Sequence, residues 1–454
     1  MKVTNVRYIL RSGVIPALAC AGLLQACGST VSKQTSAGFQ AQLDAGDYAG
    51  AADTATRSGQ IGADGKSQNL PWSLNAGSAL LDAGNSKASI ASLENAETLM
   101  QSDDLDRMQS ALDYKFATYD GVMDNTYKAI GFLLQGDSDN AGVEFRRAED
   151  RQRRAEEHFA GEAAASRQKL AQAKDASVQG LFAKAEQSKG YGDEVGHISQ
   201  MAAAYAPFEN PFATYLGGIF LLTKMDSTAS DHDAGLNKLK RANGMLGGHA
   251  GSVQSDIAWA KKASGGGTMA PQTWVVFENG QSATFSEIRL VLPMVTGRPM
   301  TLALPALSAN APASAYLNVQ AGGVAAATSS VGSFDAVMAS EFHSRMPIIL
   351  ASAIVEVVLK NGLSVGAQQS DNQILGLVAT VAANVSTADT RSWTALPKEF
   401  QAVRVATPSD GRIDLTTADG AALGDIQVPT DRSSIVYVKM QSAGAKPSLQ
   451  VIKL

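Results

Sequence analysis

The chain contains very little cysteine. Of its 454 residues only two are cysteines, Cys20 and Cys27, and both lie close to the amino terminus. Secreted domains often rely on disulfide bonds for stability, and a bond of that kind is excluded for everything that follows Cys27. The rest of the chain must therefore be held together by buried cores and polar contacts, for which its length is ample.

Blocks of positive charge are missing as well. The sequence contains 38 basic and 43 acidic residues, which gives a net charge of −5. The two signs are interleaved along the chain. A mildly acidic protein without a basic cluster is not expected to bind nucleic acid, nor to bind anionic lipid through a charged surface.

The chain also lacks an apolar run long enough to cross a membrane. Its most apolar stretch is MPIILASAIVEVVL at 346–359, which has 14 residues and contains Glu356. A transmembrane helix needs roughly 20 apolar residues, so this stretch predicts a buried helix instead.

The first residues do have the pattern of a secretory signal. Basic residues precede a short apolar segment at 14–24, and the sequence LQAC closes the pattern at 24–27. The apolar segment is too short to span a bilayer. LQAC resembles the lipobox of bacterial lipoproteins, in which a leucine stands three residues before a cysteine that becomes lipidated.

That resemblance implies that residues 1–26 are a signal peptide and that Cys27 carries acyl chains such as palmitate. Two or more acyl chains anchor a protein stably in a bilayer. Gly28 and Ser29 follow the cysteine. The lack of Asp there implies a place at the outer membrane, facing the periplasm. Cys20 is a weaker candidate for the same modification, and an ordinary cleaved signal is the alternative.

Composition changes near residue 268. Before it, Ala, Gln and charged residues recur with helical spacing, whereas runs rich in β-branched residues follow, such as TWVVFENG (273–280) and SIVYVKM (434–440). Three consecutive glycines and Pro271 lie between the two parts and predict a flexible linker at 264–271. We expect a helical domain at 27–263 and an α+β domain with a sandwich-like sheet at 272–454.

A spacing of small, large apolar and small residues recurs in the first part. Its three copies begin 52 and 94 residues apart, and a further small residue stands twelve positions before each of the first two copies, at Gly77 and Ala129. This pattern resembles that of tetratricopeptide repeats, although their period is regular. It predicts an irregular tetratricopeptide-like α-solenoid. The copies are Ser89/Leu93/Ala96, Ala141/Phe145/Ala148 and Gly235/Leu239/Ala242.

In an array of that kind, the first helix of each pair lines the concave face. Polar and aromatic residues on those helices are then free to meet a partner. The candidates are Asn75, Tyr127 and Tyr215, with a place in the core as the alternative for Tyr215.

Four charged residues border two apolar helices that we expect at 334–360 and 371–388. They are Glu341, Arg345, Asp389 and Arg391. Unpaired charges beside a core are costly, so these residues are expected to form a structural ion-pair network. A polar site for a peptide or a glycan is the alternative.

Motifs of known catalytic sites are not matched. SGQIGADGKS at 58–67 invites comparison with a phosphate-binding loop, but its glycines are out of register, and a loop between helices explains it better. Ser166 and Lys169 have the spacing of a penicillin-binding nucleophile without the companion motifs of that family. The histidines are not spaced as metal ligands, and SDHDAG at 230–235 is typical of a solvated loop. We therefore predict no catalytic site, no metal and no cofactor.

Six stretches together resemble one family of proteobacterial lipoproteins of unassigned biochemical function, built from a tetratricopeptide-like half and a β-rich half. The family has no established catalytic residues. The resemblance implies a place in the cell envelope, and its members tend to be encoded beside small lipoproteins that look like activators of penicillin-binding proteins. The stretches are EFRRAEDRQRRA (144–155), ENPFATYLGGIF (209–220), WVVFENG (274–280), LALPAL (302–307), EFHSRMP (341–347) and ADTRSWTALP (388–397).

The sequence thus predicts a membrane-anchored periplasmic lipoprotein that acts as a non-enzymatic scaffold or adaptor for cell-envelope proteins, such as other lipoproteins or peptidoglycan synthases. Helical solenoids present extended surfaces for peptides or helices, which favours this reading. An accessory regulator of peptidoglycan synthesis is one alternative. A cell-wall glycan-binding or hydrolytic module is another.

Overall fold

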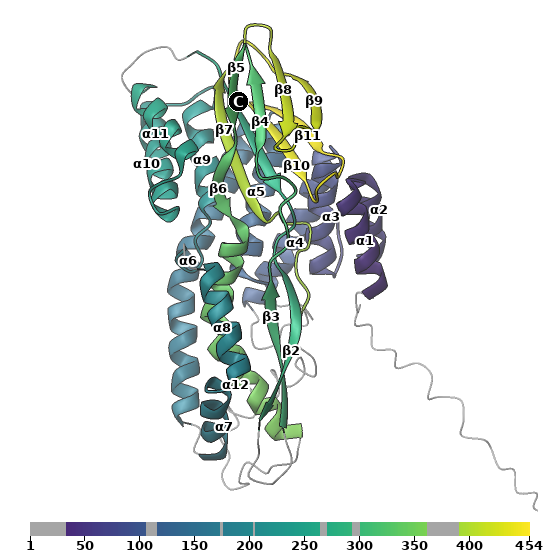
Figure 1. Ribbon diagram of the computed structural model, residues 1–454, viewed down its shortest axis with the longest axis vertical. Helices are drawn as coiled ribbons and strands as arrows, with labels where there is room; N and C mark the ends of the chain where they lie inside the picture. Colours follow the sequence, from purple (N-terminus) through teal and green to yellow (C-terminus); the bar gives the residue numbers. More distant parts are fainter. Residues whose placement is uncertain are drawn as a thin grey trace, which may run out of the picture.

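The computed structural model describes residues 33–105, 116–172, 176–202, 205–263, 270–292, 300–360 and 390–454. Helices occupy the first part of the chain and mixed sheets dominate the second (Figure 1). The expected signal peptide, Cys27, most of the expected linker (264–269), the expected helix at 371–388 and Asp389 lie outside the described residues.

The helices of the first part pack against their neighbours in the chain, from α1 to α6 and again from α9 to α11. Short turns join α1 to α2, α3 to α4, α5 to α6 and α9 to α10, so these pairs form helical hairpins. Their bounds are α1 Lys33–Ala45, α2 Tyr48–Ser58, α3 Leu70–Asp82, α4 Ser86–Leu105, α5 Thr118–Leu134, α6 Ser138–Gln172, α7 Ala176–Glu186, α8 Lys189–Ala202, α9 Pro211–Thr223, α10 Ala229–Met245 and α11 Gly251–Ala263.

Small residues bring the two helices of a hairpin close together. In α3 and α4, a Cβ added to Gly77 would lie 2.5 Å from the Leu93 side chain, so only glycine leaves room for that leucine. The Ser89 hydroxyl donates a hydrogen bond of 2.6 Å to the Gly77 carbonyl. In this hairpin Leu93 therefore fills the gap that the glycine leaves.

The first helices of two hairpins start in the same way. The Asn69 side chain accepts a hydrogen bond from the amide of Trp72 at the start of α3, and the Asn210 side chain accepts one from Ala213 at the start of α9. Asparagine satisfies amides that have no partner within a helix. A proline stands in the first turn of each helix, where its missing N–H costs nothing.

The strands form three sheets. A five-stranded sheet has the order β11-β10-β1-β7-β6, in which β1 and β10 are parallel and the other neighbours antiparallel. A four-stranded sheet has the order β5-β4-β8-β9, and β2 and β3 form a separate long hairpin. The strands are β1 Gln272–Asn279, β2 Thr284–Leu292, β3 Met300–Ser308, β4 Leu317–Ala321, β5 Val324–Ala327, β6 Ser329–Ser333, β7 Glu399–Ala406, β8 Arg412–Thr417, β9 Ala422–Gln427, β10 Ser434–Met440 and β11 Ser448–Lys453.

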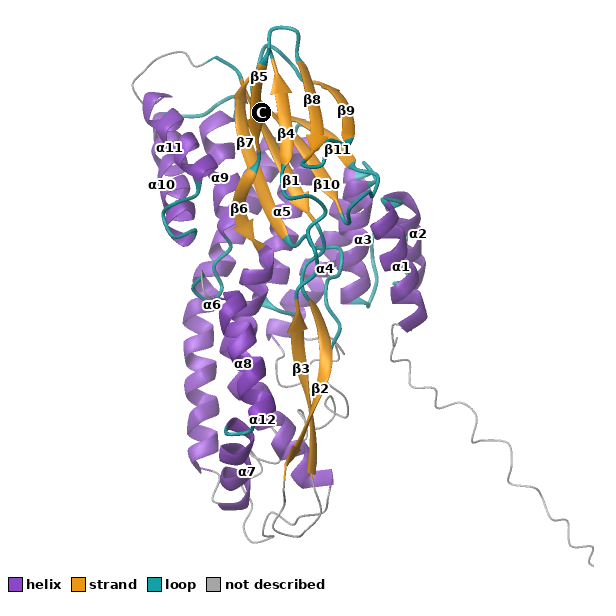
Figure 2. Ribbon diagram, in the orientation of Figure 1, coloured by secondary structure: helices purple, strands orange, loops and turns teal. Residues whose placement is uncertain are grey.

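The five-stranded sheet is covered on both faces (Figure 2). Along β1, Trp274 and Val276 belong to the core shared with the helices, whereas Val275 and Phe277 belong to the core shared with the four-stranded sheet. Successive side chains of a strand point to opposite faces, which explains the alternation. The upper part of the molecule is therefore a three-layer structure of helices, large sheet and small sheet.

The elongated lower end in Figure 1 contains α12 (Phe334–Lys360), which packs against α7, α8 and β3. The apolar stretch at 346–359 lies within this helix, as the sequence predicts. Leu350 and Ile354 are fully buried. Within the described residues, no helix combines the length and the apolar character needed to cross a membrane.

The change in composition near residue 268 does not separate two cores. One hydrophobic core contains residues of the helices, such as Trp72 and Tyr127, together with residues of the second part, such as Trp274 and Trp393. The expected domains at 27–263 and 272–454 therefore differ in secondary structure but share their largest core. The composition of the linker predicts where along the chain the helical part ends and the sheet part begins. It does not predict how the two parts pack against each other.

Candidate functional site

The expected partner-binding residues of the helical part are buried. Asn75 is 5% exposed, and its side-chain oxygen accepts hydrogen bonds from the amide of Ala395 at 3.2 Å and the hydroxyl of Thr394 at 3.3 Å. Tyr127 is 1% exposed and lies edge-on to Trp393, with 5.6 Å between ring centroids. The expectation that these residues face a partner is wrong, because residues 393–395 of the same chain cover that face.

Tyr215 also lies inside the molecule, as the alternative for it stated. Its hydroxyl donates to Asp256 at 2.7 Å, and the same carboxylate accepts from Trp274 at 3.2 Å and from the guanidinium of Arg404 at 2.9 Å. Burial raises the pKa of Asp256, and the bonds from Tyr215 and Arg404 act against that rise. This group joins α9 and α11 to the five-stranded sheet.

Glu341 binds a helix end that the sequence did not indicate. Its carboxylate accepts from the amides of Thr118 at 2.8 Å and Tyr119 at 3.2 Å, at the start of α5. Arg345 lies one turn further along α12 and pairs with Glu341 at 2.9 Å. A carboxylate at a helix amino terminus satisfies free amides and interacts favourably with the helix dipole. Of the four residues expected to form an ion-pair network, Glu341 and Arg345 pair with each other. Asp389 lies outside the described residues.

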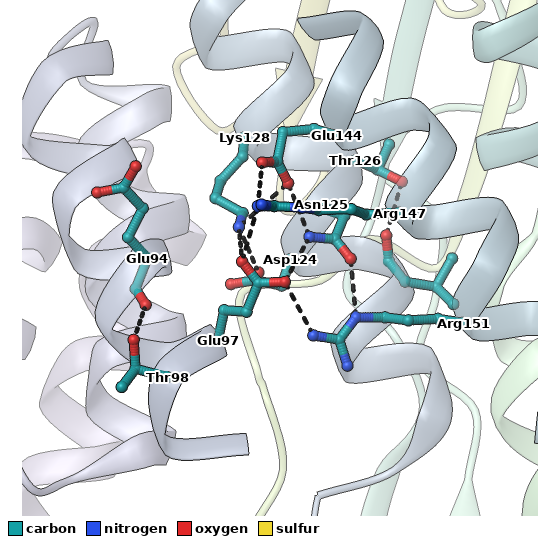
Figure 3. Close-up of polar contacts among 11 residues, drawn as sticks. Glu94, Glu97, Thr98, Asp124, Asn125, Thr126, Lys128, Glu144, Arg147 and Arg151 are labelled. Atoms are coloured by element: carbon teal, nitrogen blue, oxygen red, sulfur yellow. Dashed lines mark hydrogen bonds and ion pairs between the residues drawn. The ribbon is translucent and has the colours of Figure 1, made fainter. Parts of the chain in front are cut away.

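Two buried groups of charges stand out beyond the expected residues. The first, called here the Lys128 cluster, joins α4, α5 and α6 (Figure 3). The Lys128 ammonium is fully buried, contacts Glu97, and lies 3.1 Å from Glu144 and 3.4 Å from Asp124. The cluster consists of Glu97, Asp124, Asn125, Lys128, Glu144, Arg147 and Arg151.

Two arginines of α6 complete this cluster. Arg151 donates to Asn125 at 2.8 Å and to Glu97 at 3.1 Å, and a Cβ on Gly121 would lie 2.7 Å from its guanidinium. Arg147 donates to Glu144 at 2.8 Å and keeps a half-exposed side chain. Three cations thus face three carboxylates, so the cluster is balanced in charge, and Arg147 connects it to solvent.

The carboxylates of the Lys128 cluster have very different affinities for protons. Burial raises the pKa of Asp124 to about 7, although Lys128 attracts the charged form. Burial also acts to raise the pKa of Glu97, but Lys128, Asn125 and Arg151 outweigh it and hold that pKa at about 2. Neither oxygen of Asp124 has a hydrogen bond within the described residues. Divergent pKa values can mark an acid–base pair, yet they arise equally in structural networks.

Asp124 makes the stability of the protein depend on pH. Its pKa rises on folding from an ordinary 3.8 to about 7, so the stability it contributes is fully present below pH 3.8 and is lost as the pH rises through 7. Asp124→Asn removes this titration. As the pH rises from 5 to 8, the parent loses the contribution of Asp124 and the variant does not. Over this range the free energy of unfolding of the variant should therefore rise by about 2 kcal/mol relative to that of the parent.

Urea midpoints of both proteins across that range measure the effect. Asp150→Asn, a change on the exposed face of α6, is the control and should leave the pH dependence unaltered. Parallel profiles for the parent and Asp124→Asn would show that Asp124 does not titrate in this range.

The second group, called here the junction cluster, lies between α3 and the five-stranded sheet. The Lys439 ammonium is 3.0 Å from Asp82, 3.1 Å from Glu278 and 2.7 Å from the carbonyl of Ala395. Asp82, Glu278 and Lys439 are 8%, 0% and 1% exposed. The hydroxyl of Tyr437 donates to Glu278. These contacts connect the last residue of the helix α3 to the neighbouring strands β1 and β10.

The junction cluster holds two carboxyl groups for one ammonium. Burial raises the pKa of Asp82, Lys439 acts to lower it and Glu278 to raise it, and the balance of the three is a pKa of about 7. Burial acts to lower the pKa of Lys439, but Asp82 and Glu278 raise it above its ordinary value. A proton on Asp82 near neutral pH leaves the cluster without net charge, which is the favourable state for a buried site.

Sequence reasoning missed the junction cluster, although a signal was present. Glu278 and Lys439 each stand in a run of apolar residues, WVVFEN and SIVYVKM. A charged residue in a buried strand needs a partner, because an unpaired charge there is very costly. The pairing of β1 with β10 could not be seen from the sequence, since these parallel strands are far apart along the chain.

Other candidate sites are weaker. A shallow cavity of about 440 Å³ lies at the turn after α5 and the turn after α9, lined by residues 135–139, Met225 and Asp226. Within the described residues no group of His, Cys, Asp and Glu is arranged to hold a metal ion. No protein-family model, no curated protein and no solved structure matches this chain.

Proposed function

We propose that this protein is a lipoprotein anchored in the outer membrane through Cys27, which acts in the periplasm as a non-enzymatic scaffold for cell-envelope proteins. The observation that carries the proposal is the closeness of the lipobox to a firmly held helix. Cys27 precedes Lys33, where α1 begins, by six residues. That segment spans at most about 20 Å, so a lipid on Cys27 would hold the folded part next to the membrane.

The first helix is fixed to the rest of the protein. Phe39 packs edge-on against Trp72, with ring centroids 5.5 Å apart. Gln281 donates to Gln40 at 2.9 Å, and the hydroxyl of Ser442 donates to the carbonyl of Asp44 at 2.7 Å. An anchor ahead of α1 would therefore restrain both parts of the chain at once, which suits a scaffold that presents partners at a membrane surface.

The helical hairpins supply the surface for partners in this proposal. We regard them as an irregular tetratricopeptide-like solenoid, because small residues bring paired helices together as they do in those repeats. Its inner face is occupied by the sheet, so partners would bind outward-facing positions such as Glu94, Thr98 and Arg146, all exposed. The resemblance to envelope lipoproteins points to other lipoproteins or peptidoglycan synthases as partners.

The anchor is tested by Cys27→Ser in cells. We expect this variant to fold, to lose incorporation of labelled palmitate and to move from the membrane fraction to the soluble fraction, because the acylated thiol is gone. Cys20→Ser is the matched control and should behave as the parent. Continued labelling and membrane association of Cys27→Ser would assign the anchor to another residue.

The scaffold is tested by photo-crosslinking residues introduced at Glu94, Thr98 and Arg146, with Arg412 on the exposed face of β8 for comparison. Repeated crosslinks from the helical positions to one envelope protein support the proposal. Crosslinks from position 412 alone would move the binding surface to the small sheet. Sedimentation with purified peptidoglycan, without any protein partner, would favour the glycan-binding alternative.

A further inference from the structure

We propose that Lys439 and Asp82 become joined by an intramolecular amide bond, formed without any other protein and with Glu278 as the carrier of protons. The bond would tie the end of α3 to β10 and thus connect the helices to the large sheet covalently.

The three reacting groups are already in position. The Lys439 nitrogen is 3.0 Å from Oδ2 of Asp82 and 3.1 Å from Oε2 of Glu278. Glu278 and Lys439 are direct partners in the register of β1 and β10, so their side chains leave the sheet on the same face. Groups held at such separations react far more readily than groups that must first meet by diffusion.

Asp82 is held from the other side by β11. The hydroxyl of Ser448 donates to the carbonyl of Asp82 at 2.6 Å, and the side-chain amide of Gln450 donates to the carbonyl of Leu81 at 2.8 Å. These bonds satisfy carbonyls at the end of α3 that have no partner within the helix. They also fix the acid against Lys439, so the pair does not depend on two flexible side chains finding each other.

The surroundings keep water out. Tyr48, Tyr127, Trp393 and Tyr437 are all at most 5% exposed and belong to the same core. The ring of Tyr127 lies edge-on to Trp393, and the Tyr48 hydroxyl donates to the backbone carbonyl of Lys439 at 3.1 Å. Exclusion of water removes the competing hydration of the amine and the acid, and it protects the amide once formed.

The reaction balances without an oxidant or a co-reactant. In the state without net charge, Lys439 is an ammonium, Glu278 a carboxylate and Asp82 a carboxylic acid. Glu278 takes a proton from the ammonium, and the free electron pair of Nζ attacks Cγ of Asp82, where the C–N bond forms. Glu278 then returns its proton to the hydroxyl of Asp82, and the C–O bond to that hydroxyl breaks. The proton that the nitrogen releases goes to Glu278, one water leaves, and Glu278 ends neutral.

The Lys128 cluster shows why the same step is not expected there. Lys128 also lies beside an aspartic acid, at 3.4 Å from Asp124. Two glutamates lie beside Lys128. Glu97 is a poor carrier of protons: burial acts to raise its pKa, but Lys128, Asn125 and Arg151 hold it at about 2. Glu144 is engaged by the guanidinium of Arg147 at 2.8 Å. Arg147 also opens that cluster to solvent. Among the described residues, the groups that face Asp82 include no arginine; they are Tyr48, Tyr127, Glu278, Tyr437 and Lys439.

Such a bond would stabilise the fold covalently in a part of the chain where disulfide bonds cannot form. The chain has no cysteine after Cys27, and the two joined residues are far apart in sequence. A cross-link that closes a long loop restricts the unfolded chain and so stabilises the folded one.

Intact-mass measurement of the full chain carrying Cys27→Ser tests the proposal. We expect a mass lower than that of the sequence by one water, and a digest containing the peptide of Asp82 joined to the peptide of Lys439. Glu278→Gln keeps the size of the side chain but cannot carry the proton, and Lys439→Arg keeps the charge. Both variants should have the full mass.

A protease site placed within 264–269 gives a second measurement. After cleavage, the two parts of the parent should remain one band on a denaturing gel, whereas those of Glu278→Gln should separate. Three results would overturn the proposal: a folded parent of full mass, a parent that separates into two bands, or a Glu278→Gln protein that stays joined.

Discussion

The helical segment, residues 27–263, is expected not to fold when it is produced alone. Its inner face contributes Trp72, Tyr127 and Phe212 to the core shared with the sheets, and each is at most 3% exposed in the whole chain. Exposing a large apolar side chain costs roughly 1.5–3 kcal/mol, so exposing these three alone costs about 5–9 kcal/mol, which is comparable with the usual stability of a domain. Phe212, for example, stacks on Phe400 with 3.6 Å between ring centroids.

Far-UV circular dichroism and size-exclusion chromatography of the fragment measure this effect. We expect weak helicity without a cooperative melt, together with aggregation, and recovery of soluble protein when residues 264–454 are produced in the same cell. A monomeric fragment with a sharp melt near that of the full chain would contradict the expectation, and would restore the helical part as an independent domain.

Lys128→Met is expected to lower the free energy of unfolding by about 3–5 kcal/mol, because removing one partner of a buried ion pair leaves the others uncompensated. Glu97 and Glu144 would then lie buried beside Asp124 without the ammonium that separates them. Arg147→Met is the matched control. That side chain is 52% exposed, so its loss should cost less than about 1 kcal/mol.

Urea denaturation followed by tryptophan fluorescence measures both variants. Adding Glu97→Gln to Lys128→Met should recover part of the lost stability, since it removes one of the unbalanced charges. Equal midpoints for Lys128→Met and Arg147→Met would contradict the role assigned to the Lys128 cluster.

Local features of the fold could be predicted from the sequence because they depend on neighbouring residues. The alternating run at 273–280 and the run at 434–440 are strands β1 and β10, and the apolar run at 346–359 lies in α12. The small residue at Gly77 packs against Leu93 as its spacing indicates. These patterns indicate which face of a helix or strand carries small or apolar side chains.

What covers each face could not be predicted in the same way. Asn75 and Tyr127 have side chains typical of a binding surface, and only the three-dimensional structure shows that residues 393–395 lie against them. Glu341 was expected beside other charges, but its main partner is the start of α5. The junction cluster joins residues from α3, β1 and β10, and contacts over such distances leave no periodic trace in a sequence.

We expect the helices and the sheets to form one cooperative unit, closed by a shared core and by the junction cluster. Differential scanning calorimetry of the full chain tests this cooperativity most directly. We predict a single transition whose calorimetric enthalpy equals its van't Hoff enthalpy, because the largest core contains residues of both parts and neither part can keep it alone. Two resolved transitions, one of them reproduced by residues 27–263 alone, would show that the two parts unfold independently.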